Sequence, residues 1–550
     1  NLSGICPRTG RDHRDRPTVS LPRRGVGGGE VPLTTPGKQN RIGDKFGGKG
    51  PYYMKEQWFE AIERHIPTGE VRTRFGPSPT GYMHVGNLRT AIYAWLIARR
   101  AGGKFLLRIE DTDQVRQVEG AVEIICRTLR QCGLSWDEGP DVGGPVGPYV
   151  QTARRELYLP YAELLVERGC AYRCFCEKME PEEECGVFDR GDAPCRALSP
   201  AEVRANLHAG RPYVIRQRIP RQGRTTFHDL VFGDITVDNR TLDDQILIKR
   251  DGLPTYNFAN VIDDHLMGIT HVVRGSEYLS SAPKYDLLYQ SFGWKIPHYV
   301  HCAPVMRDQK HKLSKRHGDP SYEDLLAMGY LSDAIVNYVA LLGWAPTGEQ
   351  KEREFFLLEE LAEYFDIAGL SKSPAIFDLN KLNYFNACYL RALSPEDFYV
   401  GAEPYLKETV QDSQVDLRLA ARLLQPRCTT WMDIAPQIDF LGALPPYPNE
   451  LYRSERWRVN EKNSAELLIQ IRSELEALPV WTDDALHAAL SSLAVRQGVK
   501  LGTILWPLRI ALSGRAVTPG GAVELCCVLG RAESLRRICQ GIAQLPPAAD

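Results

Sequence analysis

The sequence has 550 residues, more than one compact core accommodates, so we expect three or more domains. Its apolar fraction of 43% and charged fraction of 25% are ordinary for a globular protein, and it contains no apolar run of membrane-spanning length. The net charge of −2 requires that any nucleic-acid partner meet basic residues gathered on one face.

Residues 1–53 differ from the rest of the chain. They are basic, rich in glycine and proline, and without apolar periodicity, which predicts disorder. Helical spacing begins only after Met54. We therefore interpret residues 1–53 as a leader that is not native, translated from upstream of Met54 or present as a fragment. The alternative is an organellar transit peptide, which the acidic residues and the lack of an amphipathic pattern disfavour.

A strand, a helix and a second strand are predicted next, at residues 71–75, 88–96 and 105–109. Such a unit has parallel strands, and ligands bind beyond the carboxyl ends of those strands. Arg74, His84 and Glu110 all fall at that edge. The sequence therefore predicts a ligand site there, in an α/β domain whose first half covers residues 54–149.

The pattern changes several times further along the chain. Residues 150–257 form a mixed α/β insertion with a group of cysteines, and strand-like character returns at 260–262 and 269–274, in a second half of the sheet domain at 258–309. Helical spacing dominates residues 310–391 and nearly all of 392–550. The predicted fold is thus a Rossmann-like parallel-sheet domain, split by an insertion and followed by an all-helical region.

Two motifs carry the chemistry. Residues 74–87 read RFGPSPTGYMHVGN and turn from the strand through a Pro/Gly loop into a helix, whose first N–H groups and dipole can receive phosphate. Residues 312–316 read KLSKR, a basic loop suited to a polyphosphate. Together with LRIEDTD at 107–113, these motifs resemble the signatures of class I aminoacyl-tRNA synthetases, specifically the glutamyl branch.

The resemblance implies an enzyme that activates glutamate with ATP and Mg²⁺ and transfers it to the 3′-terminal adenosine of tRNA(Glu). Such activation needs positioning and cations that hold charge on the departing pyrophosphate. The alternative interpretations are that His84 only caps the helix and that the basic loop at 312–316 is only a solvated charged segment. The catalytic residues implied are His84, Lys312, Ser314 and Lys315. The ATP-binding residues implied are His84, Gly86, Asn87, Tyr278, Val305, Met306, Lys312 and Lys315.

The amino-acid site should recognise an acidic side chain. A γ-carboxylate suits a guanidinium fork and an α-ammonium suits a carboxylate. The resemblance gives the first role to Arg74 and Arg274 and the second to Glu110. The alternative interpretation is that Arg74 and Glu110 form an ordinary ion pair between neighbouring strands. The glutamate-binding residues implied are Arg74, Gly76, Ser78, Glu110, Tyr256, Asn260 and Arg274.

The 14 cysteines are irregularly spaced, which favours reduced thiols and a cytoplasmic protein. Cys174, Cys176 and Cys195 resemble the zinc-binding knob of some bacterial glutamyl enzymes. Zinc takes four ligands in a structural site, and where those enzymes carry a fourth this chain has Ala197, although Cys185 would substitute. A bound zinc and a knob that has lost its metal both fit the sequence.

The remaining implications concern the tRNA. The insertion should bind the acceptor end, residues 310–391 should contact the stem, and residues 392–550 should bind the anticodon. Arg427 lies in a segment resembling one where discriminating glutamyl enzymes place an arginine against the last anticodon base. The family implies a monomer, and the lack of a long apolar run implies no membrane association. The alternatives are an enzyme that also charges tRNA(Gln), and a catalytically inactive tRNA-binding protein.

Overall fold

The computed structural model describes residues 51–176, 194–313, 318–411 and 414–546. Residues 51–66, with helix α1 (Pro51–Glu63), belong to a unit of their own, and the second unit begins at Pro67. None of the helices in the described ranges is long and apolar enough to cross a membrane.

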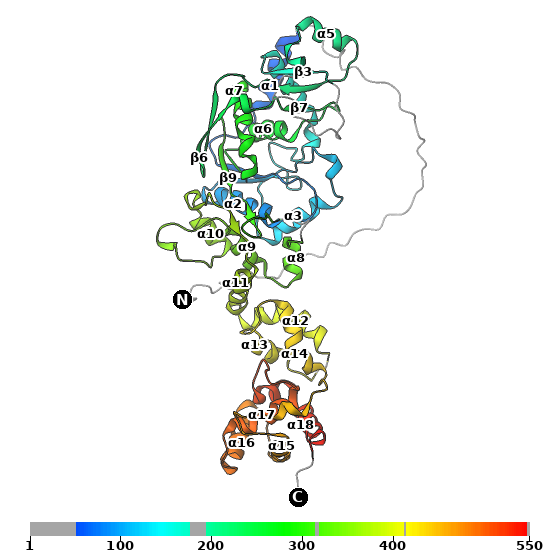
Figure 1. Cartoon of the computed structure of the whole chain (residues 1–550), viewed down its shortest axis with the longest axis vertical. Coiled ribbons are helices and arrows are strands. Elements are labelled where there is room, and N and C mark those ends of the chain that lie inside the picture. Colours follow the sequence, from blue (N-terminus) through cyan, green and yellow to red (C-terminus); the bar gives the residue numbers. More distant parts are fainter. Residues whose placement is uncertain (1–50, 177–193, 314–317, 412–413, 547–550) are drawn as a thin grey trace, which may run out of the picture. The chain divides into compact units, whose positions relative to one another are not determined.

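The largest sheet described in the second unit has six strands (Figure 1). Its strand order is β2 (Lys104–Leu107), β1 (Arg72–Phe75), β8 (His271–Gly275), β9 (His298–Cys302), β5 (Arg224–Asp229), β6 (Gly233–Asp238). Every neighbouring pair is parallel except β5 and β6, which form an antiparallel hairpin at one edge. The predicted mixed α/β fold with a mainly parallel sheet is confirmed.

Helix α2 (Val85–Arg100) connects β1 to β2 and is buried along most of its length. Its apolar side chains pack in one core with those of the parallel strands. The other helices of this part are α3 (Ala121–Gln131), α4 (Arg155–Glu167), α5 (Pro200–His208), α6 (Tyr256–Leu266) and α7 (Ala282–Phe292). The crossover brings the first turn of α2 to the carboxyl edge of the sheet, as the sequence pattern predicts.

The insertion contains a separate antiparallel sheet of β3 (Ala171–Cys174), β4 (Val214–Gln217) and β7 (Ile246–Ile248). The predicted insertion of residues 150–257 also includes β5 and β6, which instead extend the largest sheet through pairing of Asp229 with Tyr299. This pairing joins segments 70 residues apart, so the local pattern of the hairpin gave no sign of it.

Residues 260–262, expected to be strand-like, lie in the middle of α6. The run is short and buried and is apolar at Val261 and Ile262, and so short a run has no periodicity that separates a strand from a buried helix. Thr255 begins the helix in an extended conformation. The predicted strand at 269–274 corresponds to β8.

Beyond the short parallel pair β10 (Val305–Met306) and β11 (Ala375–Ile376), the described residues contain helices and no further strand (Figure 1). The first of these helices are α8 (Tyr322–Ala327), α9 (Ser332–Ala340), α10 (Leu358–Tyr364) and α11 (Leu379–Ala392). They are followed by α12 (Pro395–Thr409), α13 (Leu417–Leu424), α14 (Ile434–Gly442), α15 (Glu461–Glu476), α16 (Asp483–Arg496), α17 (Leu501–Ser513) and α18 (Ala522–Gln544).

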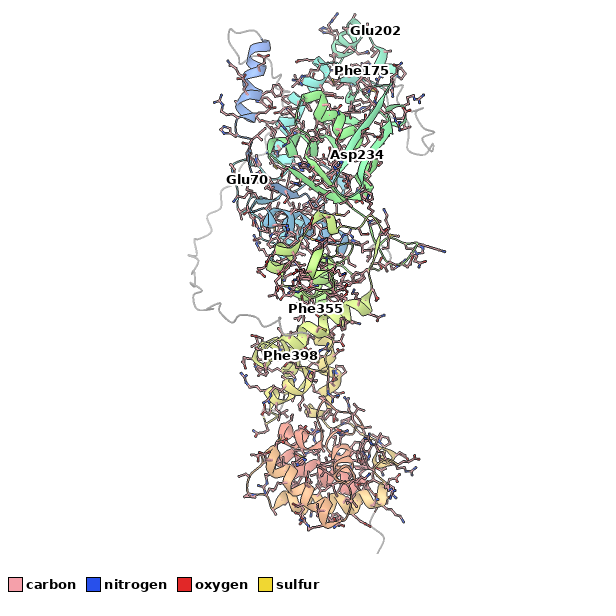
Figure 2. All side chains as sticks on the ribbon, turned by 90° about the vertical axis from the view of Figure 1, so that its left-hand side faces the viewer. Glu70, Phe175, Glu202, Asp234, Phe355 and Phe398 are labelled. Atoms are coloured by element: carbon pink, nitrogen blue, oxygen red, sulfur yellow. The ribbon has the colours of Figure 1, made fainter. Side chains whose placement is uncertain are left out.

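Two hydrophobic cores divide the second unit. The first joins the largest sheet to helices α8–α11, and the second lies among α12–α18. Phe355 packs against the first core and Phe398 is buried in the second (Figure 2). The helices after α11 therefore have a core that is independent of the sheet.

Candidate active site

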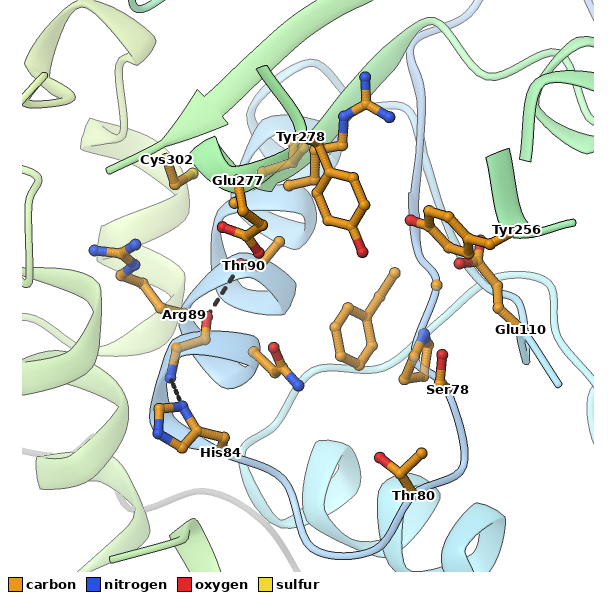
Figure 3. A pocket seen from close by; sticks show the side chains of 18 of the residues that line it. Ser78, Thr80, His84, Arg89, Thr90, Glu110, Tyr256, Glu277, Tyr278 and Cys302 are labelled. Atoms are coloured by element: carbon orange, nitrogen blue, oxygen red, sulfur yellow. Dashed lines mark hydrogen bonds between the residues drawn. The ribbon is translucent and has the colours of Figure 1, made fainter. Parts of the chain in front are cut away.

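A pocket of about 600 Å³ opens at the carboxyl ends of the parallel strands (Figure 3). Most of the residues predicted to bind ATP or glutamate line it. These are Arg74, Gly76, Ser78, His84, Gly86, Asn87, Glu110, Tyr256, Arg274, Tyr278, Val305 and Lys312. Met306 belongs to β10 and Asn260 is buried on α6 one turn after Tyr256, and neither lines the pocket.

The first turn of α2 forms one wall. Gly81, at φ +112°, allows the loop to turn before the helix, a conformation that favours glycine. His84 then caps α2, and its Nδ1 accepts a hydrogen bond from the Gly86 N–H at 3.0 Å (Figure 3). The capped helix start, with its positive dipole end, faces the pocket and can receive an anion.

A chain of buried charges lies beneath the opposite wall. Arg74 donates to Asp264 through Nε at 2.9 Å and Nη2 at 3.1 Å, although the two residues are 190 positions apart. Arg108 bridges the same carboxylate, at 2.7 Å, and Glu110 Oε1, also at 2.7 Å. All four side chains are almost completely buried. Breaking a buried pair of this kind leaves an uncompensated charge, which is costly.

The two carboxylates of this network differ in their protonation equilibrium. Burial would raise the pKa of Asp264, but the charges of Arg74 and Arg108 outweigh it, so its pKa lies below the ordinary value. Burial raises the pKa of Glu110, and Arg108 and Arg74 offset only part of that shift. Glu110 is therefore the carboxylate that an additional cation would stabilise in its charged form.

Three polar atoms in this region have no hydrogen-bond partner among the described residues: Glu110 Oε2, Arg274 Nη2 and Asn260 Nδ2. Buried polar groups are nearly always paired, so unpaired ones indicate places for a ligand. The Arg74 fork is occupied by Asp264, whereas no described carboxylate forms an ion pair with Arg274. The pocket thus offers one acceptor and an uncompensated guanidinium, the complement of an amino acid with an acidic side chain.

Close packing explains one glycine of the predicted site. A Cβ at Gly76 would lie 2.4 Å from Glu110 Oε1, so any larger residue would displace that carboxylate. Tyr256 and Tyr278 stand together with ring centroids 5.5 Å apart (Figure 3). Ser78 is exposed at the pocket rim. Arg108 and Asp264 were not predicted, although an arginine inside the apolar strand at 105–109 is itself a sign of a buried partner.

The basic loop reaches the pocket at its start. Lys312 lines the pocket, and the backbone of residue 312 bridges to Met306 of β10. Ser314 and Lys315 lie outside the described residues, so their predicted roles remain predictions.

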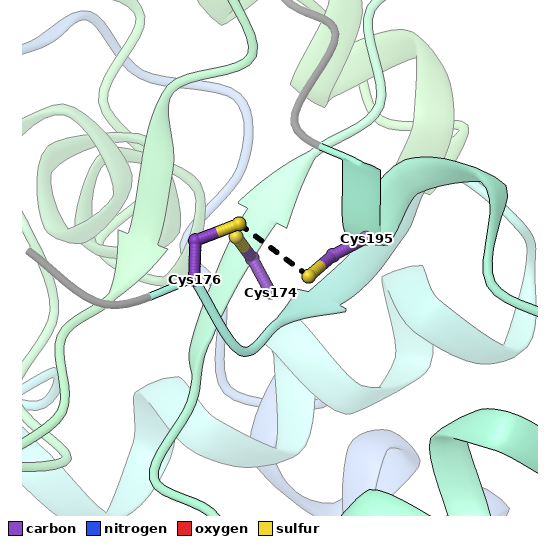
Figure 4. A group of neighbouring side chains, drawn as sticks. All are labelled: Cys174, Cys176 and Cys195. Carbon is purple, nitrogen blue, oxygen red and sulfur yellow. Dashed lines mark hydrogen bonds between the residues drawn. The ribbon is translucent and has the colours of Figure 1, made fainter.

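Three cysteines gather in the insertion (Figure 4). The Sγ atoms of Cys174, Cys176 and Cys195 all lie within 4.8 Å of one another, and those of Cys176 and Cys195 are 3.5 Å apart. Sulfur ligands at about 2.3 Å from a tetrahedral zinc would be separated by roughly 3.8 Å, so the three thiols fit such an ion. Cys185, the predicted fourth ligand, lies outside the described residues.

Arg427 follows the end of α13 and has an exposed side chain. Its backbone N–H donates to the carbonyl oxygen of Leu424 at 2.8 Å. The adjacent Gln425 anchors this turn through hydrogen bonds to the carbonyl oxygens of Leu390 and Leu393. The guanidinium is therefore presented from a fixed turn.

Comparison with known proteins gives consistent matches. Residues 70–384 match the family described as tRNA synthetases class I (E and Q), catalytic domain, and residues 397–542 match an anticodon binding domain. Glutamate–tRNA ligases of Clostridium botulinum (strain Hall) and Clostridium novyi (strain NT) are each 53% identical to the chain, covering 87% of it and 99% of their own length.

Solved structures agree. The glutamate tRNA ligase of Elizabethkingia meningosepticum, in complex with its amino acid, is 33% identical, with a TM-score of 0.80 over 87% of this chain and 100% of that one. The glutamate-tRNA synthetase of Elizabethkingia anophelis is also 33% identical, with a TM-score of 0.77 over 86% and 100%.

Proposed function

The chain belongs to the class I glutamyl-tRNA synthetases and is a glutamate–tRNA ligase, and from this premise we propose how its residues carry out the reaction. Enzymes of this class use ATP and Mg²⁺. The α-carboxylate of glutamate attacks the α-phosphate of ATP, so that glutamyl-adenylate forms and pyrophosphate leaves. A hydroxyl of the 3′-terminal adenosine of tRNA(Glu), the 2′-hydroxyl by the family resemblance, then displaces AMP.

Glutamate binds against the unpaired polar atoms of the pocket. Glu110 Oε2 accepts from the α-ammonium, and Arg274 Nη2 donates to the γ-carboxylate. The guanidinium of Arg74 is paired with Asp264, so Arg74 contributes its positive charge to the site but does not bind the γ-carboxylate through both nitrogens. The surrounding wall is shaped by Gly76, Ser78, Tyr256 and Asn260. The observation that carries this proposal is the uncompensated charge of Arg274, which is 5% exposed.

ATP binds along the start of α2. His84, Gly86 and Asn87 meet phosphate and ribose, and Tyr278, Val305 and Met306 complete the nucleotide site. Lys312 and Lys315 balance the charge that develops on the departing pyrophosphate, and Ser314 donates a hydrogen bond to it.

The remaining parts act on the tRNA. Residues 150–257 receive its acceptor end, residues 310–391 contact the stem, and α12–α18 bind the anticodon, with Arg427 against its last base. Zinc, where bound, would be held by Cys174, Cys176 and Cys195, with Cys185 as the proposed fourth ligand, and would stiffen the insertion. We further propose that the enzyme is a cytoplasmic monomer, on the strength of the family resemblance.

The test is pyrophosphate exchange into ATP in the presence of tRNA(Glu), with glutamate compared with glutamine. We expect exchange with glutamate, and we expect Glu110→Gln to raise the KM for glutamate at least about tenfold, because a charged hydrogen bond is lost. Glu138→Gln is the matched control, since Glu138 is also buried but pairs with Arg72 and does not line the pocket. An equal KM in both variants would refute the assignment of Glu110.

A further inference from the structure

Arg274 is held from behind by a histidine. Its Nε donates to Nε2 of His301 at 3.1 Å, and Nδ1 of His301 lies 2.7 Å from Oδ2 of Asp229. The side chains of His301 and Asp229 are both 0% exposed. The sequence motifs of the family resemblance include neither residue.

The surroundings of Asp229 decide where the imidazole carries its proton. Oδ1 of Asp229 accepts from the backbone N–H groups of Val231 at 2.9 Å and Phe232 at 2.7 Å. Oδ2 accepts from the backbone N–H of His301 at 3.1 Å, in addition to its contact with the imidazole. Burial would raise the pKa of Asp229, but His301 and these N–H groups outweigh it, so its pKa lies below the ordinary value. A carboxylate surrounded by donors accepts only, so Nδ1 of His301 carries the proton and Nε2 is left as an acceptor for Arg274.

The imidazole is also held neutral. Burial lowers the pKa of His301, and the positive charge of Arg274 lowers it further, against the opposing effects of Asp229 and Glu277. Asp229 faces the imidazole from β5, Arg274 from β8 and Glu277 from the turn after β8. The ring of Tyr299, which is on β9 like His301, lies 5.9 Å from the imidazole. A protonated His301 would lose its acceptor atom and place a second cation against Arg274.

Aromatic rings enclose the rest of the guanidinium. The Cζ of Arg274 lies 4.5 Å from the ring centroid of Tyr285, 5.3 Å from that of Tyr299 and 5.4 Å from that of Tyr278. These contacts are attractive but have no preferred in-plane orientation. The hydrogen bond to His301 is therefore the interaction that fixes the rotation of the guanidinium plane.

We infer that Asp229 and His301 form a positioning pair that fixes Arg274 with Nη2 directed at the substrate, and so sets the preference for a carboxylate over an amide. The inference rests on the proposed role of Arg274. A guanidinium presents donors alone in every orientation, and these match both oxygens of the glutamate side chain but oppose the NH₂ of glutamine. Held in one orientation, Arg274 cannot turn away from that NH₂ to relieve the mismatch. Once free to rotate, Arg274 would discriminate less.

Two substitutions separate this role from simple packing. His301→Phe keeps a ring of similar size but removes both nitrogens. His301→Gln keeps an amide oxygen and an NH₂ with about the spacing of the two ring nitrogens, so it can accept from Arg274 and donate to Asp229. We expect the phenylalanine variant to raise the KM for glutamate about 10- to 100-fold, as for the loss of a hydrogen bond to a charged group, with a smaller change in kcat and an unchanged KM for ATP.

The KM of His301→Gln for glutamate should stay within about threefold of the parent value. The ratio of glutamate to glutamine activation should likewise be near the parent value in His301→Gln and lower in His301→Phe. His271→Phe is the control, since His271 lies on neighbouring β8 against Thr270 and His298 instead of Arg274. If packing is the whole role, phenylalanine would be tolerated at least as well as glutamine, which would overturn the inference.

Arg274→Gln links the test to the proposed function. If His301 acts through Arg274, adding His301→Phe to Arg274→Gln should not raise the KM for glutamate further. Two results would overturn the positioning pair but not the role of Arg274. One is a KM for glutamate in the double variant that is raised by the product of the two single effects. The other is a parental KM in His301→Phe together with a raised KM in Arg274→Gln. An unchanged KM in Arg274→Gln overturns the carboxylate site and this inference with it.

Should His301→Phe fail to fold, Asp229→Asn tests the same pair. Its carbonyl oxygen would take the N–H groups of Val231 and Phe232, leaving its NH₂ to donate to Nδ1 of His301. The imidazole proton would then move to Nε2, where it opposes Arg274. We expect a rise of about tenfold or more in the KM for glutamate. A KM equal to that of the parent would overturn the inference.

Discussion

Asp264→Asn should destabilise the sheet core more than any exposed ion-pair variant. Asp264 accepts three hydrogen bonds from two buried guanidiniums, at 2.9 and 3.1 Å from Arg74 and 2.7 Å from Arg108. The amide has almost the same shape but carries no charge and turns a donor toward one arginine. Removing one partner from such a buried network costs about 3–5 kcal/mol.

The assay is thermal unfolding followed by near-ultraviolet circular dichroism at pH 7. For a core of this size, that free energy corresponds to a fall in Tm of roughly 10 °C. Asp137→Asn is the control, because Asp137 pairs with Arg99 at 2.8 Å where both side chains are partly exposed, an interaction worth less than about 1 kcal/mol. Equal shifts in the two variants would refute the reasoning.

The difference should depend on pH. The pKa of Asp264 is depressed in the folded state, so its contribution is fully present above the unfolded value of about 3.9 and is lost as the pH falls through the lower, folded value. The gap in Tm between the parent and Asp264→Asn should therefore be constant from pH 7 to about pH 5 and close only at more acid pH. A gap that closes near neutral pH would contradict the assigned direction.

Three further predictions concern the loop, the cysteines and the anticodon. Lys315→Ala should slow adenylate formation by about two to three orders of magnitude with glutamate affinity nearly unchanged, measured by pyrophosphate exchange; parental exchange would refute its catalytic role. Protein purified without chelator should carry about one zinc per chain, lost in Cys174→Ser, and metal analysis near zero would show a knob without metal. Arg427→Gln should narrow the ratio of charging efficiencies between tRNA(Glu) and tRNA(Gln) without changing Tm, because a guanidinium matches the acceptors of cytosine and opposes the donors of guanine, at about 1–3 kcal/mol. An unchanged ratio would make Arg427 an ordinary helix-end arginine.

The position of the pocket follows from the sequence pattern alone. Parallel strands end at one edge of a sheet, so the spacing of Arg74, His84 and Glu110 along a strand, a helix and a strand was enough to bring them together. The helical periodicity after residue 320 likewise predicted the all-helical tail, because an amphipathic face is a local property. Most residues assigned by the motifs line the pocket for the same reason.

Long-range packing determines which of those side chains already have an ion-pair partner. Arg74 and Arg274 look equivalent in the sequence, but Asp264, 190 positions away, occupies the fork of one and leaves the other without a described carboxylate partner. The tertiary structure also placed β5 in the largest sheet, which brings Asp229 against His301 from 72 positions away. Charge pairing and burial depend on neighbours that only the folded chain supplies, and no local pattern encodes them.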